Sequence, residues 1–113
     1  MGWDIKSALS DEIIHNPRKL LSEYQFTLRD LSPTIAIRLY ELIGADGVIF
    51  EQSHYIHTPM QAGPYQPSRP WGDDEAYALH LAVTSLTQYY NDAVRQGHSP
   101  KGPWLIPNET FGR

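Results

Sequence analysis

Residues 73–96 read DDEAYALHLAVTSLTQYYNDAVRQ, and this stretch has the clearest periodicity in the chain. Its apolar residues recur every three or four positions, which is the spacing of one helical face: Leu79, Val83, Leu86, Tyr90 and Val94. Alanines lie beside this stripe at Ala76, Ala82 and Ala93, and polar residues lie opposite at His80, Thr84, Gln88, Asn91 and Arg95. The sequence therefore predicts one long amphipathic helix.

The ends of this helix carry suitable residues. Asp73 and Asp74 can accept hydrogen bonds from the first turn and oppose the positive end of the helix dipole. Gly97 can adopt the left-handed conformation that often follows a helix, and Arg95 stands in the last turn. We expect the helix to occupy residues 73–96.

Two proline-rich segments with aromatic residues flank the helix. Residues 59–72 read PMQAGPYQPSRPWG, and residues 99–107 read SPKGPWLIP. The second segment is too apolar for a freely solvated extension, so we expect Trp104 to Ile106 to pack back on the body. The alternative is that this tail binds a partner.

The first part of the chain gives weaker signals. Trp3 to Ile14 can form a helix, since Ile5, Leu9 and Ile13 are spaced by four residues. Asn16-Pro17 can start a second, short helix that reaches Glu23. Tyr24 to Arg29 alternates apolar and polar residues and predicts a strand, although a helix continuing from Pro17 is the competing interpretation.

A third helix is expected after Ser32-Pro33, which combines a capping residue with a proline in the first turn. Its apolar residues are Ile35, Ala36, Leu39, Leu42 and Ile43, and Gly44 would end it.

Val48 to His57 is the strongest strand candidate. It is either one strand ending near Pro59 or a hairpin bent around Gln52-Ser53. If Tyr24 to Arg29 is also a strand, the third helix would be a crossover connection between the two.

These elements predict a compact α+β fold for residues 1–113 as one domain, with about three helices and a two- or three-stranded sheet. Two strands make a weak sheet, and extension of the sheet across a homodimer would strengthen it. The alternative fold is all-α with extended proline-rich arms.

Composition excludes several classes of function. The 113 residues include no cysteine, which excludes disulfides and cysteine-based metal or catalytic sites. The net charge is −4 with scattered basic residues, so nucleic-acid binding is not expected. We find neither an apolar run of about 20 residues nor a secretory signal, and we expect a cytoplasmic protein with no membrane contact.

Histidines are the candidate metal ligands. His54, His57 and His80 could converge with Glu51 or Asp74, but histidines three apart on a strand point to opposite faces. No motif requires a metal, and no cofactor is expected.

Aromatic residues in and near the flanking segments are the candidate protein-binding set, because such residues and arginine are enriched in interface hot spots. They are Tyr65, Arg69, Trp71, Tyr77 and Trp104. Peripheral packing of these rings is the alternative. The first functional hypothesis is a non-enzymatic interaction module, an adaptor, accessory subunit or protein inhibitor, that self-associates.

Two other hypotheses remain open. One is a small metal-dependent or histidine-based enzyme that uses the histidines above. The other is a nucleic-acid-associated regulator that uses basic residues Arg18, Lys19, Arg29 and Arg38. The sequence does not identify a partner or substrate.

Overall fold

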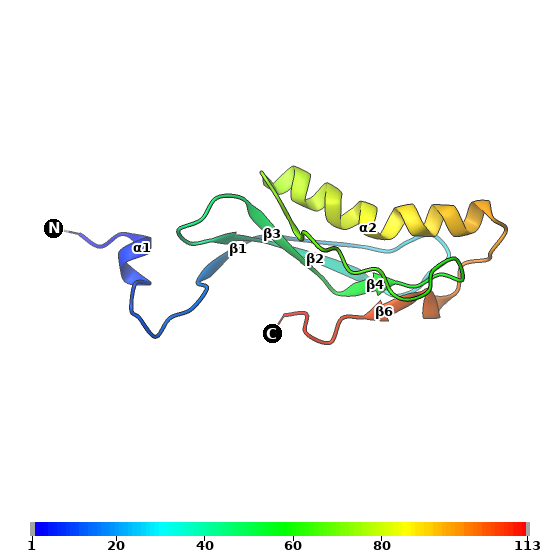
Figure 1. The fold of residues 1–113 in the computed structure, drawn as a ribbon, viewed down its shortest axis with the longest axis horizontal. Coiled ribbons are helices and arrows are strands. Elements are labelled where there is room, and N and C mark those ends of the chain that lie inside the picture. The colour runs from blue at the N-terminus through cyan, green and yellow to red at the C-terminus, as the bar shows by residue number, and fades with distance from the viewer. Residues whose placement is uncertain (1, 113) are drawn as a thin grey trace.

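The computed structural model describes residues 2–112 and shows an elongated α+β protein (Figure 1). Its principal extents are 64 × 24 × 23 Å, and its radius of gyration is 16.9 Å. A compact domain of this length has a radius of gyration of about 13 Å. The α+β class is confirmed, whereas the compact shape and the all-α alternative are wrong.

The chain forms two sheets and one long helix. In order, the elements are α1 (Ile5–Ala8), β1 (Arg18–Phe26), β2 (Ile35–Leu42), β3 (Val48–Gln52), β4 (His54–Ile56), β5 (Trp71–Gly72), α2 (Glu75–Arg95), the short 3-10 helix η1 (Gly102–Trp104) and β6 (Leu105–Pro107). The larger sheet has the order β1-β2-β3-β5 with antiparallel neighbours, and β4 pairs with β6 in the smaller one. The larger sheet therefore exceeds the predicted two- or three-stranded sheet, and α2 is the one long helix among residues 2–112.

Helix α2 covers one face of the larger sheet (Figure 1). Alternation along β2 turns Ile35, Ile37 and Leu39 toward the core, and β3 adds Val48 and Phe50. Burial of each such side chain stabilises the fold by about 1.5–3 kcal/mol.

The expected third helix is strand β2. Ile35, Leu39 and Leu42 do follow helical spacing, but Ile35, Ile37 and Leu39 also alternate, and isoleucine is stiff and favours strands. The expected crossover is also wrong, because β1 and β2 are antiparallel neighbours joined by a turn in which Asp30 has φ 64°.

The first two expected helices are mostly absent. Only Ile5–Ala8 is helical in the first, and the second lies inside β1. The strand expected from Tyr24 to Arg29 is present only as the end of β1. A register shift between Leu20 and Ser22 breaks the alternation of β1, which hides it from pattern reading.

The strand predicted from Val48 to His57 is broken at Ser53 into β3 and β4. The two halves pair with different strands, so the structure is not a hairpin. The Ser53 hydroxyl accepts a hydrogen bond from the Ala36 amide at 2.8 Å, and the Ser53 amide donates to the Ala36 carbonyl at 2.9 Å. These bonds hold the bend against the start of β2.

The long helix is confirmed as Glu75–Arg95. The Asp74 carboxylate accepts a hydrogen bond from the Tyr77 amide at 2.8 Å, and Gly97 follows with φ 90°. The buried face is rotated from the predicted stripe. It contains Leu86 and Tyr90 together with four small residues: Ala78, Ala82, Ser85 and Ala93. Small side chains let the helix axis approach the sheet closely.

The C-terminal segment packs on the body, as predicted. Trp104 is 5% exposed, and its ring meets Tyr90 edge-on with a centroid distance of 6.0 Å. The Tyr90 hydroxyl donates to the Arg29 carbonyl at 2.6 Å, which joins helix, tail and the β1–β2 turn.

Within residues 2–112, no helix combines the length and apolarity needed to cross a bilayer.

Candidate functional site

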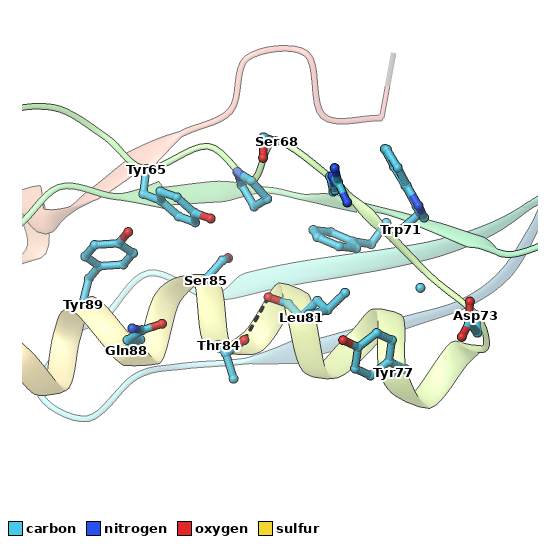
Figure 2. Close-up of a pocket in the computed structure, with 14 residues that line it drawn as sticks. Tyr65, Ser68, Trp71, Asp73, Tyr77, Leu81, Thr84, Ser85, Gln88 and Tyr89 are labelled. Atoms are coloured by element: carbon cyan, nitrogen blue, oxygen red, sulfur yellow. Dashed lines mark hydrogen bonds between the residues drawn. The ribbon is translucent and has the colours of Figure 1, made fainter.

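A groove of about 500 Å³ lies between the proline-rich segment and helix α2 (Figure 2). We call residues 59–72 the proline-rich loop and this hollow the aromatic groove. Phe50 comes from β3. The proline-rich loop, whose last two residues form β5, supplies Tyr65, Pro67, Ser68, Arg69, Trp71 and Gly72. Asp73 and helix α2 supply the remaining lining: Tyr77, Leu81, Thr84, Ser85, Gln88 and Tyr89.

Backbone hydrogen bonds fix the proline-rich loop at its middle and near its end. The Tyr65 amide donates to the Ile56 carbonyl at 3.0 Å, and the Phe50 amide donates to the Pro70 carbonyl at 2.9 Å. Earlier in the loop, the Gln61 side-chain amide donates to the Ile56 and Gly63 carbonyls. The loop is thus an ordered wall, and its prolines reduce the entropy that ordering costs.

Gly72 sets the distance between this wall and the helix. A Cβ atom at this position would lie 2.8 Å from the Ala78 backbone nitrogen and 2.9 Å from Cδ2 of Tyr77. Backbone atoms inside a helix cannot move away cheaply. Glycine is therefore required where β5 crosses the first turn of α2.

Five aromatic rings line the groove, and Phe50 is one of them. Tyr65 and Tyr89 contact each other across it with ring centroids 4.9 Å apart, and Tyr77 stacks on His80 at 6.2 Å. Trp71 lies opposite Ile49 in the β3–β5 pair, so its ring points away from α2 at the outer rim (Figure 2). Trp71 and Tyr77 are 52% and 51% exposed.

The structure brings four of the five candidate binding residues together. Tyr65, Arg69, Trp71 and Tyr77 all line the aromatic groove. Trp104 does not, because it lies in the core against Tyr90. Their role in binding stays a prediction.

The three candidate metal ligands have separate partners. His54 Nδ1 lies 2.8 Å from the Ser53 hydroxyl, and His57 Nε2 lies 3.2 Å from the Gln61 carbonyl oxygen. His80 stacks on Tyr77. Across residues 2–112, no three histidine, aspartate or glutamate side chains are grouped to hold a metal ion.

Burial lowers the pKa of His54, which favours the neutral imidazole. The acids proposed to assist the histidines are also engaged. Glu51 pairs with Arg18 at 3.1 Å, and Asp74 caps α2.

Two of the basic residues considered for nucleic-acid contact are paired on the sheet. The guanidinium of Arg18 lies 3.9 Å from the Tyr40 ring centroid as well as beside Glu51. Arg38 bonds to Glu23, and this hydrogen bond is the main cause of the lowered pKa of the Glu23 carboxyl. Both arginines therefore have neighbouring acids that reduce their local positive potential.

Sequence reasoning missed two aromatic residues of the groove, Phe50 and Tyr89. Phe50 was read only as part of a strand, and Tyr89 stands beside the predicted apolar stripe of α2. The adjacent tyrosines Tyr89 and Tyr90 could have indicated a ring outside the core. Neighbouring helical residues point about 100° apart, so only one of the two can face the centre of the core.

Comparison with protein-family models, with curated proteins and with solved structures finds no match to this chain.

Proposed function

We propose that this protein is a non-enzymatic interaction module whose aromatic groove binds an apolar segment of a protein partner. The observation that carries the proposal is the combination of exposed rings with an ordered backbone. Trp71 and Tyr77 keep about half of their surface in water, although β5 and the first turn of α2 fix their backbones.

Ordered aromatic residues favour binding for a physical reason. Association has to offset the entropy lost when side chains and loops become ordered, and a preorganised surface reduces that cost. Tyrosine and tryptophan have only two side-chain torsions and bury large areas, so they dominate interface energies. The groove concentrates such residues on a short length of chain.

The polar groups of the groove suit a peptide backbone. Tyrosine hydroxyls and the Gln88 amide can donate or accept hydrogen bonds. The Arg69 guanidinium forms no ion pair with another side chain in residues 2–112, and it supplies a positive charge at the loop. Thr84 is different, because its hydroxyl already donates to the His80 carbonyl at 2.9 Å.

Site-specific photocrosslinking in the native cell tests this proposal. A photoreactive phenylalanine analogue replaces Tyr77 in the groove or, as a control, Met60, which is equally exposed at 51% but does not line it. We expect discrete protein adducts from position 77 only, and loss of these adducts when Trp71→Ala is added. Equal adducts from both positions, or adducts that survive Trp71→Ala, would contradict the proposal.

A further inference from the structure

The first residues of the chain form an apolar arm that the body does not cover. We call residues 2–16 the N-terminal arm; all of them except Leu9 are exposed. Trp3 is 86% and Ile13 is 80% exposed, and Ile5 and Ile14 are also exposed. Helix α1 contains no buried residue. Such a concentration of exposed large apolar side chains is unusual on a monomer.

The molecule as a whole exposes more surface than its mass requires. Its accessible surface is 7670 Å². A compact monomer of 12.9 kDa exposes about 6,300 Å². The excess of roughly 1,400 Å² exceeds the approximately 800 Å² that each partner buries in a standard interface. One chain thus has enough uncovered surface for a stable contact with another.

The arm and the aromatic groove are suitably placed for such a contact. The arm projects from the end of the sheet toward which the N-terminal end of α2 points (Figure 1), and that end of the helix carries Tyr77 at the groove. Two copies meeting at this end in antiparallel orientation could each direct an arm along the other. A twofold arrangement uses the same two surfaces twice.

One charged residue of the groove suits the same pairing. The arm carries three carboxylates, Asp4, Asp11 and Glu12, and one lysine, which gives a formal charge of −2 with His15 neutral. The groove contributes Arg69, whose guanidinium has no acidic partner among residues 2–112, and also Asp73, so the attraction for an acidic arm is local to Arg69. Complementary charge orients encounter and fixes register more than it adds affinity.

We infer that the N-terminal arm binds in the aromatic groove of a second copy of this chain, so that two exchanged arms form a symmetric homodimer. The inference rests on the proposed function, because the groove is the receiving surface. Trp3 and Ile13 are the apolar anchors of the arm, and Tyr77 receives them, with the exposed Trp71 ring at the outer rim of the groove.

Sedimentation equilibrium of the full chain over a range of concentrations tests the inference. We expect a reversible dimer of twice 12.9 kDa. The double variant Trp3→Ser, Ile13→Ser should raise the dimer dissociation constant by about tenfold or more, and Tyr77→Ala should do so as well. Met60→Ser is the control and should leave the constant unchanged.

Folding does not confound this test. Trp3, Ile13 and Tyr77 are exposed in the single chain, so the variants should retain the circular dichroism spectrum of the wild type. Wild-type protein that stays monomeric at all concentrations would overturn the inference. An unchanged dissociation constant in the arm variant or in Tyr77→Ala would overturn it too.

Photocrosslinking from position 3 identifies the receiving surface. A mixture of chains with light and heavy nitrogen isotopes should give mixed-isotope crosslinks from position 3 to residues 65–77. Single-isotope crosslinks would mean that the arm folds on its own chain, and crosslinks to other regions would mean that it binds elsewhere; either result overturns the inference. A monomer whose position 77 still forms adducts with another protein would leave the proposed function standing without the arm exchange.

Discussion

The two proline-rich segments resemble each other in sequence but differ in what they bury. Each contains prolines, glycine, one basic residue and one tryptophan. Trp71 of the proline-rich loop is 52% exposed, whereas Trp104 of the C-terminal segment is 5% exposed. Position in the fold explains the difference, since Trp71 lies in β5 and Trp104 ends η1. Trp71 shares its face with Ile49 on the side away from α2, and Trp104 enters the core beside Tyr90. Similar composition can thus provide a contact surface in one segment and core packing in the other.

The largest expected difference is in stability. Trp104→Ala should lower the free energy of unfolding by about 3–5 kcal/mol, because it leaves a cavity against Tyr90. Trp71→Ala should change it by about 0.5 kcal/mol or less, because half of that ring is already in water. Urea unfolding followed by circular dichroism measures both. Equal losses would mean that the two segments do not differ in this way.

The next largest change in stability is expected where the loop approaches α2 closely. Gly72→Ala should cost about 1–3 kcal/mol, since the added Cβ meets the Ala78 backbone nitrogen at 2.8 Å. Gly63→Ala is a matched control in the same loop, where an added Cβ meets nothing within 4 Å. We expect the control to unfold at the wild-type urea concentration. A tolerated Gly72→Ala would show that β5 does not cross the helix so closely.

A smaller effect on the free energy of unfolding is expected from His54, at the bend between β3 and β4. Burial lowers the pKa of His54 from 6.5, so below that pH the unfolded chain binds more protons at this residue than the folded chain does. This histidine therefore makes stability decrease as the pH falls through 6.5 toward its folded pKa. His54→Asn should flatten this part of the stability curve, which thermal unfolding at a series of pH values measures. Identical curves for both proteins would contradict the burial of the ring.

The sequence predicted the elements with a strong local signature. The long helix, its Asp74 cap and the packing of Trp104 to Ile106 are confirmed because periodicity, capping chemistry and apolar content each act locally. Strand β2 was missed because Ile35, Leu39 and Leu42 fit helical spacing while Ile35, Ile37 and Leu39 fit a strand. Short apolar stretches fit both a helix and a strand, and here pairing with the neighbouring strands determines that the segment is a strand.

The groove was predictable only in part. Tyr65, Arg69, Trp71 and Tyr77 were chosen from composition, and the fold brings them together. Phe50 and Tyr89 entered the groove through strand order and helix rotation, which depend on contacts distant in sequence. The outward direction of Trp71 likewise follows from its pairing with Ile49. Pairing between segments that are distant in sequence determines these features, so local sequence patterns could not predict them.

The most direct measurement compares Trp71→Ala with Trp104→Ala in protein that carries the photocrosslinker at position 77, and records both the protein adducts and the unfolding midpoint. If the proline-rich loop is an ordered contact surface, Trp71→Ala will abolish the protein adducts while it keeps the wild-type unfolding midpoint, and Trp104→Ala will lower that midpoint. A Trp71→Ala protein that retains the adducts, or that loses them only because it unfolds as readily as Trp104→Ala, would contradict this account.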